Sequence, residues 1–316
     1  MEQSRIVYFG TADFAVPPLQ SLLACPENFD VVAVVSQPDR PAGRHRERLP
    51  SPVSAMVQRS KLPLLQPESV DLPFLEALRG LRADLFVVAA YGRILPRQVL
   101  EMPKLGSVNL HGSLLPKYRG ASPIQSAILD GETETGVTLI LMDEKMDHGP
   151  ILATAIETIR EDDDYLSLAG RLSEAAAGLL TDSLTRLADG TLHTQEQDHS
   201  LATFTKMIRK EDGLIDWTTA DAWEVERRMR AYRPWPGIHF DWTTRNGHTV
   251  RTRLLATEVV HANGQTPGAV IETENGLPAV VVADDEAVLL VEVQPEGRRP
   301  MSGADFLRGY PPSETI

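Results

Sequence analysis

The chain has 316 residues, of which 42% are hydrophobic and 24% charged, and its formal net charge is −13. This composition is typical of a folded protein with a sizeable core and, at this length, of about two domains. The negative charge argues against a general nucleic-acid coat. The single cysteine, Cys25, excludes an internal disulfide and a cysteine-based zinc site.

The charge is unevenly distributed along the chain. Residues 130–164 hold eleven acidic and two basic residues, whereas 37–50 hold four arginines against two acids and 245–253 hold three arginines and no acid. The two basic islands leave open a local contact with a polyanion, and equally a plain solvated surface. No signal peptide and no apolar run of about 18 residues is found, so we expect a cytoplasmic protein that does not enter membranes.

The first half alternates apolar runs with helical patterns. Near-continuous apolar strands between helices are typical of a mostly parallel, Rossmann-like α/β sheet with helices on both faces. The predicted strands are 5–10, 29–37, 82–92, 106–111 and 135–143, and the predicted helices lie within 11–24, 51–60, 72–81 and 165–190.

The sequence pattern changes from residue 206 onward. One short helix is predicted at 220–232, followed by short alternating strands at 248–260, 268–273, 277–284 and 287–294. Short strands separated by Gly, Pro and Asn indicate a small OB-like β-barrel. We therefore expect a first domain over 1–189, a polar linker over 190–205 and a second domain over 206–316.

Several familiar active-site motifs are absent. The first strand is followed by "GTADFA", which is not the G-x-G-x-x-G of dinucleotide-binding proteins. There is no phosphate-binding P-loop, no H-E-x-x-H and no G-x-S-x-G. The histidines lack the spacing of metal ligands, so no metal site is expected. Hydride transfer with a dinucleotide, ATP hydrolysis and triad hydrolysis all lose support.

Polar side chains gather in the stretch "NLHGSLLPKYRG" (109–120). Asn109 and His111 are two residues apart on a predicted strand, so their side chains share one face. Ligands of open α/β sheets bind beyond the carboxyl ends of the strands. The segment 142–149 follows the next strand and is expected at such an end too, so its Asp147 can approach the same crevice.

An amide, an imidazole and a carboxylate fit the transfer of an acyl group to an amine. The amide can donate to an oxyanion, and the imidazole can protonate a leaving nitrogen. The carboxylate can orient the imidazole or take a proton from the amine. The residues alone leave the alternative open that Asn109 and His111 are only a structural hydrogen-bonded pair.

Two long stretches resemble a known family. "NLHGSLLPKYRGASPIQSAI" followed by "GVTLILMDEKMDHGPIL" is similar to the formyltransferases that use 10-formyltetrahydrofolate. The resemblance implies that Asn109, His111 and Asp147 form the catalytic trio. It also implies that the folate donor is held by the turn "SLLP" and the backbone of "YGRIL". The implied folate contacts are Arg93, Leu95, Ser113, Leu114, Leu115 and Pro116.

Members of this family differ in the amine that they formylate. "SQPDRPAGRHRERLPSPV", "KMIRKEDGLIDW" and the C-terminal "PEGRRPMSGADFLRG" resemble the members that act on methionine carried by initiator tRNA. The resemblance implies that Phe14 lies near the methionine, that Arg40, Arg44 and Arg46 contact tRNA, and that the C-terminal barrel over 206–316 binds tRNA. We expect a monomer. Formylation of an amino sugar nucleotide, and non-catalytic binding of tRNA or folate, are the alternatives.

Overall fold

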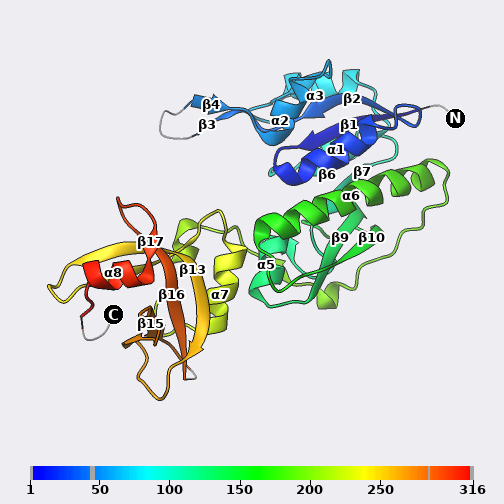
Figure 1. Ribbon diagram of the computed structural model, residues 1–316. Helices are drawn as coiled ribbons and strands as arrows, with labels where there is room; N and C mark the ends of the chain where they lie inside the picture. Colours follow the sequence, from blue (N-terminus) through cyan, green and yellow to red (C-terminus); the bar gives the residue numbers. More distant parts are fainter. Residues whose placement is uncertain (1–2, 43–46, 284, 314–316) are drawn as a thin grey trace. The chain divides into compact units, whose positions relative to one another are not determined.

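The structure, a computed structural model, describes residues 3–42, 47–283 and 285–313 (Figure 1). The chain divides into two compact units. The N-terminal unit comprises the residues up to Ile124 together with Thr133–Ile159 and Ser167–Lys206. The C-terminal unit comprises Gln125–Glu132, Arg160–Leu166 and the residues from Met207 onward.

The N-terminal unit is built on a seven-stranded sheet in the order β10-β9-β7-β6-β1-β2-β5. Strands β1, β2, β5, β6 and β7 are parallel. β9 runs antiparallel to β7, and β10 runs antiparallel to β9, so only β9 is reversed relative to the other strands. This confirms the predicted mostly parallel α/β fold. The strands are β1 (Ser4–Gly10), β2 (Phe29–Val35), β5 (Leu64–Leu65), β6 (Leu85–Ala89), β7 (Ser107–His111), β9 (Glu134–Leu141) and β10 (Ile151–Thr158). The short strands β3 (Arg40–Ala42) and β4 (Glu47–Leu49) form a separate pair.

Helices begin where the sequence supplies caps and early prolines. The Oγ of Ser51 accepts from the backbone N–H of Ser54, and the carboxylate of Asp71 accepts from Phe74. These bonds satisfy N–H groups that have no partner inside the helix. The helices are α1 (Val16–Leu23), α2 (Pro52–Val57), α3 (Leu72–Gly80), α4 (Arg97–Leu100), α5 (Pro123–Leu129) and α6 (Tyr165–Ala188), with a 3-10 turn at Asp13–Ala15.

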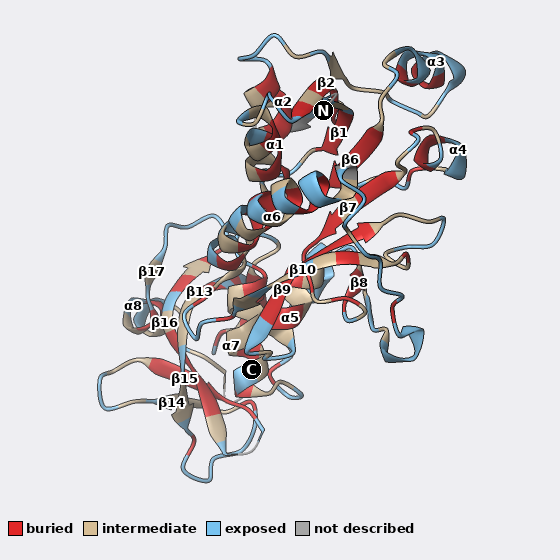
Figure 2. Ribbon diagram, turned by 90° about the vertical axis from the view of Figure 1, so that its right-hand side faces the viewer, coloured by how far each residue is buried: buried red, intermediate tan, exposed pale blue. Residues whose placement is uncertain are grey.

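Helices cover both faces of the sheet (Figure 1). On β1, Val7 and Phe9 point into a core formed with α3 and α4, whereas Tyr8 points the other way and donates to Ala15. On that second side Ser21 of α1 donates to Ala177 of α6. The strands between the two layers are buried along most of their length, as the red segments of Figure 2 show.

Several segments of this unit were not anticipated, including β3, β4, β5 and α4 as well as β10 and the structure within 190–205. β10 was missed because only one of its faces is covered, so its residues alternate between polar and apolar without a continuous apolar run. Residues 190–205 contain a 3-10 turn (His199–Leu201) and the strand β11 (Phe204–Thr205), which pairs with β8 (Arg119–Gly120). That polar stretch is therefore folded against the N-terminal unit.

The C-terminal unit is an antiparallel half-barrel, in agreement with the predicted small β domain. Its strands lie in the order β12-β13-β16-β15-β14, and β17 pairs with β16. Trp242 and Phe306 are fully buried and their rings touch at a centroid distance of 4.9 Å. The elements are α7 (Ala222–Ala231), β12 (Ile238–Thr243), β13 (Thr249–His261), β14 (Val270–Glu272), β15 (Pro278–Val281), β16 (Glu286–Pro295), β17 (Met301–Ser302) and α8 (Gly303–Gly309), preceded by a 3-10 turn at Lys210–Gly213.

No helix in the described part of the chain is long and apolar enough to cross a membrane.

Candidate active site

The site is formed at the end of β7, where Asn109 and His111 meet Asp147. The Nδ2 of Asn109 donates to Oδ1 of Asp147 at 3.4 Å, and the Nδ1 of His111 lies 3.5 Å from the same oxygen. The side chains of His111 and Asp147 are only 6% and 13% exposed. One carboxylate oxygen therefore faces both the amide and the imidazole, with little water between them.

A backbone carbonyl determines which ring nitrogen of His111 carries a hydrogen. Its Nε2 lies 2.9 Å from the carbonyl oxygen of Tyr118. A carbonyl can only accept, so Nε2 carries a hydrogen and donates it to Tyr118. Nδ1 is therefore the ring nitrogen that faces Asp147.

Asp147 reaches the trio by a route that differs from the expected one. β9 is antiparallel to β7, and its last residue, Leu141, pairs with Val108 near the beginning of β7 rather than with His111. The prediction that the loop leaves a parallel strand at the same edge is therefore wrong. The loop instead folds back along β7, which brings Asp147 to the two side chains.

The loop around Asp147 has a tightly constrained backbone. Asp147 has a φ of +49°, a left-handed conformation that is unfavourable for a residue with a Cβ. At Gly149 an added Cβ would lie 1.9 Å from the carbonyl oxygen of Leu141, so no side chain fits. The backbone N–H of Gly120 donates to the second carboxylate oxygen of Asp147 at 2.8 Å. The carboxylate is thus held from two sides.

The turn implied to bind folate follows His111 directly and is anchored by Thr138. The buried Oγ1 of Thr138 donates to the carbonyl of Ser113 at 2.6 Å and accepts from the N–H of Leu115 at 3.1 Å. The Oγ of Ser113 donates to the carbonyl of Lys117 at 2.7 Å. Ser113 and Leu115 are buried, whereas Leu114 and Pro116 are partly exposed.

The segment "YGRIL" lies just after β6, where three strands end. The carbonyl of Tyr91 accepts from the hydroxyl of Thr11 at 3.0 Å and from Nε2 of Gln37 at 2.8 Å. The side chain of Leu95 belongs to the core, so only its backbone can face a ligand. The guanidinium of Arg93 donates to the carbonyls of Pro67 and Glu68, which orders the adjacent loop.

The residues implied to contact the methionine and the tRNA are placed only in part. Phe14 is half-buried in the 3-10 turn that follows β1. Arg40 is exposed at the start of β3 and donates to Oε1 of Gln37 at 3.0 Å. Arg44 and Arg46 lie outside the described residues.

The sequence patterns gave no role to Gln197, which contacts the loop that carries Asp147. Its Nε2 donates to the carbonyls of Asp147 and Gly149, and its Oε1 accepts from Arg119. The surrounding stretch is polar and without periodicity, so no pattern marked this residue. The contact comes entirely from the tertiary fold.

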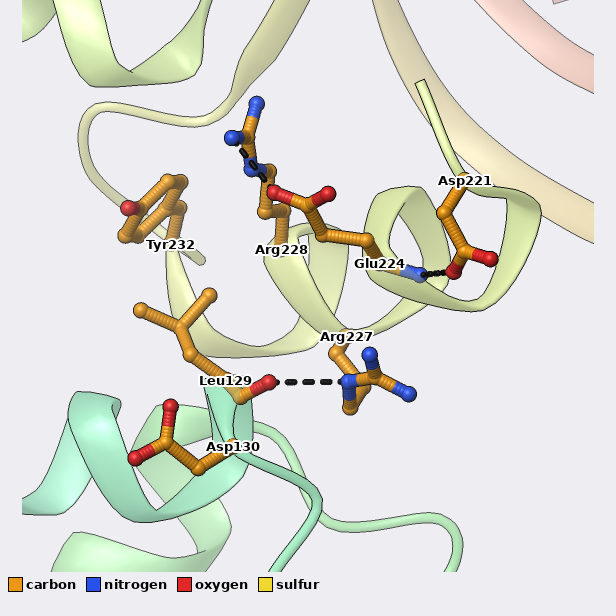
Figure 3. Close-up of a pocket in the computed structure, with 7 residues that line it drawn as sticks. All are labelled: Leu129, Asp130, Asp221, Glu224, Arg227, Arg228 and Tyr232. Carbon is orange, nitrogen blue, oxygen red and sulfur yellow. Dashed lines mark hydrogen bonds and ion pairs between the residues drawn. The ribbon is translucent and has the colours of Figure 1, made fainter. Parts of the chain in front are cut away.

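A separate hollow lies in the C-terminal unit (Figure 3). It has a volume of about 470 Å³, and in it Arg228 pairs with Glu224 at 2.6 Å while Arg227 donates to the carbonyl of Leu129. The lining residues are Leu129, Asp130, Asp221, Glu224, Arg227, Arg228 and Tyr232. None of the predicted site residues lies there. No cluster of His, Cys, Asp and Glu suited to a metal ion occurs among the described residues.

Comparison with known proteins assigns the class. Two family models match the chain: the formyl transferase model covers residues 4–184, and the formyl transferase C-terminal domain model covers residues 207–311. The chain therefore belongs to the formyl transferase family. This confirms the family resemblance inferred from the sequence. It also confirms the prediction that the protein is an enzyme of the transferase class.

Within this family the chain is similar to methionyl-tRNA formyltransferases. It is 47% identical over 307 residues to the protein of that name from Chloroflexus aggregans, covering 96% of this chain and 97% of that protein. It is 42% identical over 314 residues to the one from Citrifermentans bemidjiense, covering 98% of this chain and 95% of that protein. The agreement extends over both units.

Solved structures share the fold at lower sequence identity. One is an N-formyltransferase from Helicobacter canadensis in complex with folinic acid and dTDP-3-aminofucose. It is 18% identical with a TM-score of 0.61, and the match covers 91% of this chain and 98% of that chain. Folinic acid is a folate, and the formyl transferases form a folate-dependent family.

Proposed function

We propose that the protein transfers a formyl group from 10-formyltetrahydrofolate to the free amino group of methionine esterified to initiator tRNA. One observation carries the proposal. The side chains of Asn109 and His111 both face Oδ1 of Asp147, beside the turn that follows β7. The similarity to methionyl-tRNA formyltransferases over nearly the whole chain supports the acceptor.

The first step forms a carbon–nitrogen bond. The neutral amine attacks the formyl carbon, and the formyl oxygen becomes an oxyanion as the carbon turns tetrahedral. The Nδ2 of Asn109 and a protonated Nδ1 of His111 are the donors available to this oxygen. Fixed donors in a water-poor site stabilise such an oxyanion more than solvent does. No covalent enzyme intermediate is needed.

The second step breaks the bond between the formyl carbon and N10 of the folate. The attacking nitrogen gives up a proton, and N10 takes one as it leaves. Asp147 serves this exchange either by keeping His111 charged or by accepting the proton of the amine. Its second oxygen stays bonded to Gly120, which keeps the carboxylate aimed at the trio.

The donor and the acceptor are assigned to different edges of the site. The folate is proposed to contact the turn Ser113–Pro116 and the backbone of Arg93 and Leu95. Phe14 is proposed to lie near the methionine side chain. Arg40, Arg44 and Arg46 are proposed to contact tRNA phosphates, since guanidinium groups match phosphate oxygens. We expect a monomer that acts in the cytoplasm.

The test is transfer of labelled formyl from 10-formyltetrahydrofolate to charged initiator tRNA. We expect formyl-methionine after mild hydrolysis of the tRNA ester. Glycinamide ribonucleotide and an amino sugar nucleotide serve as control acceptors with the same donor. Formylation of the amino sugar nucleotide in place of the tRNA would establish the alternative acceptor. Binding of tRNA or folate with no formylated product would contradict an enzymatic role.

A further inference from the structure

One residue of the stretch 191–205 stands apart from its neighbours. Gln197 is 5% exposed, and it is the only buried residue in this stretch, all of which the structure describes. A buried amide needs hydrogen-bond partners, because an unpaired one carries a desolvation penalty of about 1–3 kcal/mol. The partners of Gln197 are therefore informative.

The amide of Gln197 connects the catalytic loop to a buried arginine. Its Nε2 donates to the carbonyl oxygens of Asp147 at 3.0 Å and Gly149 at 2.7 Å. Its Oε1 accepts from Nε and Nη2 of Arg119 at 3.3 Å and 2.6 Å. The orientation of the amide is unambiguous, because a guanidinium only donates and a carbonyl only accepts.

Arg119 is itself fixed in place. It is 3% exposed, and its Nη2 also lies 2.9 Å from Nδ1 of His199, which must act as the acceptor. The backbone of Arg119 pairs with β11, and its N–H donates to the carbonyl of Thr203. Gln197 is thus held by a rigid partner next to Gly120, the residue whose N–H binds the carboxylate of Asp147.

Gln197 binds the strained part of the loop that carries Asp147. Asp147 has a positive φ, and such conformations persist only where the surroundings stabilise them. Hydrogen bonds to the carbonyls of Asp147 and Gly149 fix the peptide that follows Asp147 and the peptide that follows Gly149. Without them the loop loses two of its anchors, and we expect the carboxylate to shift relative to His111 although Gly120 still binds it.

We propose that Gln197 is a positioning residue that holds Asp147 in its catalytic geometry, with Arg119 orienting Gln197. The inference rests on the proposed function, since it deepens the role given to Asp147. It assigns part of the catalytic geometry to a stretch that the sequence suggested was only a linker.

Two substitutions separate positioning from packing. Gln197→Glu keeps the volume and the contact with Arg119 but places a carboxylate against two carbonyls, so the donors are lost. Gln197→Met keeps the volume and loses every hydrogen bond. The matched controls are Gln195→Glu and Gln195→Met, two residues away on an exposed side chain of the same stretch.

The measurements are kcat and the KM for each substrate with the parent and the four variants. Misplacement of a reacting group by about 1 Å costs on the order of 100-fold in rate. We therefore expect both Gln197 variants to lose about 10- to 100-fold in kcat with KM values within about threefold of the parent. The Gln195 variants should keep the parent's kcat.

Combination with Asp147→Asn tests whether Gln197 acts through Asp147. If it does, adding Gln197→Met to Asp147→Asn lowers kcat by less than about threefold further, because the effects of residues acting as a unit are not additive. A full multiplicative loss would overturn the inference, as would a parent-like kcat in Gln197→Glu. A parent enzyme that formylates no methionyl-tRNA would instead contradict the proposed function.

Discussion

The end of β7 and strand β13 of the half-barrel use charged groups in opposite ways. At the first, His111 and Asp147 are 6% and 13% exposed, and each also bonds to backbone. On the second, Arg251 is 49% exposed and pairs with Asp241, which is 45% exposed. The proposed chemistry requires groups fixed in one geometry and shielded from water, whereas an exposed ion pair is screened by solvent and contributes little.

The pairing on the half-barrel also limits what its charges can do. The hydrogen bond from Arg251 lowers the pKa of Asp241 below its ordinary value and raises that of Arg251. The pair therefore stays ionised and largely neutralises itself over the whole physiological pH range. A phosphate that approaches Arg251 must compete with this carboxylate, so the contribution of Arg251 to anion binding is reduced.

The largest expected effect lies in the trio of Asn109, His111 and Asp147. Asp147→Asn removes the charge that faces His111 while keeping the shape of the side chain. We expect kcat to fall by about 10²- to 10⁴-fold, the usual contribution of acid–base assistance. Steady-state formylation of methionyl-tRNA measures it.

The control for this change is Glu144→Gln in the same loop, an exposed residue paired with Arg97 on the surface. Exposed ion pairs contribute about 0–1 kcal/mol, so this variant should keep the parent's kcat. An Asp147→Asn enzyme within about threefold of the parent would remove Asp147 from the mechanism.

The next effect concerns the turn implied to bind folate. Thr138→Val leaves the carbonyl of Ser113 and the N–H of Leu115 without their partner, at a cost of about 1–3 kcal/mol. We expect the KM for the folate donor to rise about tenfold, with a smaller change for tRNA.

The matched control is Thr135→Val, on the same strand. Thr135 is also buried, and its hydroxyl has no hydrogen-bond partner in the described part of the chain. This variant should leave both KM values unchanged. A donor KM that stays constant in Thr138→Val would mean that the turn does not hold folate.

A smaller effect, on tRNA binding, is expected from the arginine-rich loop within residues 37–50. Replacement of Arg44 and Arg46 by Ala should raise the KM for tRNA several-fold at low salt. It should also reduce the slope of log affinity against log salt by about 0.7–0.9 for each lost phosphate contact. Binding assays over a range of salt concentrations measure this slope, and an unchanged slope would show that the loop does not contact phosphate.

The smallest expected effect is a pH dependence of stability that comes from His239 in the half-barrel. Burial, assisted by the nearby Arg251, lowers the pKa of His239 below its ordinary value of 6.5. The unfolded chain therefore binds the proton more readily than the folded one. Stability contributed by the neutral ring is present above about pH 6.5 and is lost as the pH falls through the folded-state pKa.

His239→Gln removes this titration. Between about pH 7.5 and about pH 5.5 the parent should lose about 2 °C more in Tm than the variant. Thermal melts at the two pH values measure the difference. An equal loss in both proteins would show that His239 does not contribute to the acid sensitivity.

The tryptophans show where composition misleads. Tryptophan is highly buried on average, and of the four at positions 217, 223, 235 and 242, Trp217 and Trp242 are indeed buried. Trp223 and Trp235 are more than half exposed. For Trp223 the reason is visible, since its Nε1 donates to Glu286 and holds the ring at the surface. A large apolar residue is thus not by itself a sign of the core.

Local patterns in the sequence determined much of this protein. Apolar runs and helix caps located most elements, since they report burial and hydrogen-bonding needs that a short segment carries by itself. The motifs around Asn109 and Asp147 were long enough to indicate the family. They also named the trio whose side chains the structure brings together.

The assembly of the trio depends on long-range contacts that the sequence patterns did not reveal. Contacts between residues far apart in the chain set the direction of β9 and bring the loop with Asp147 back to His111. Such contacts also let Gln197 bind the backbone of that loop. No local pattern encodes such contacts, because a polar residue in an aperiodic stretch looks the same whether it faces water or a buried carbonyl. Folding gives Gln197 its partners.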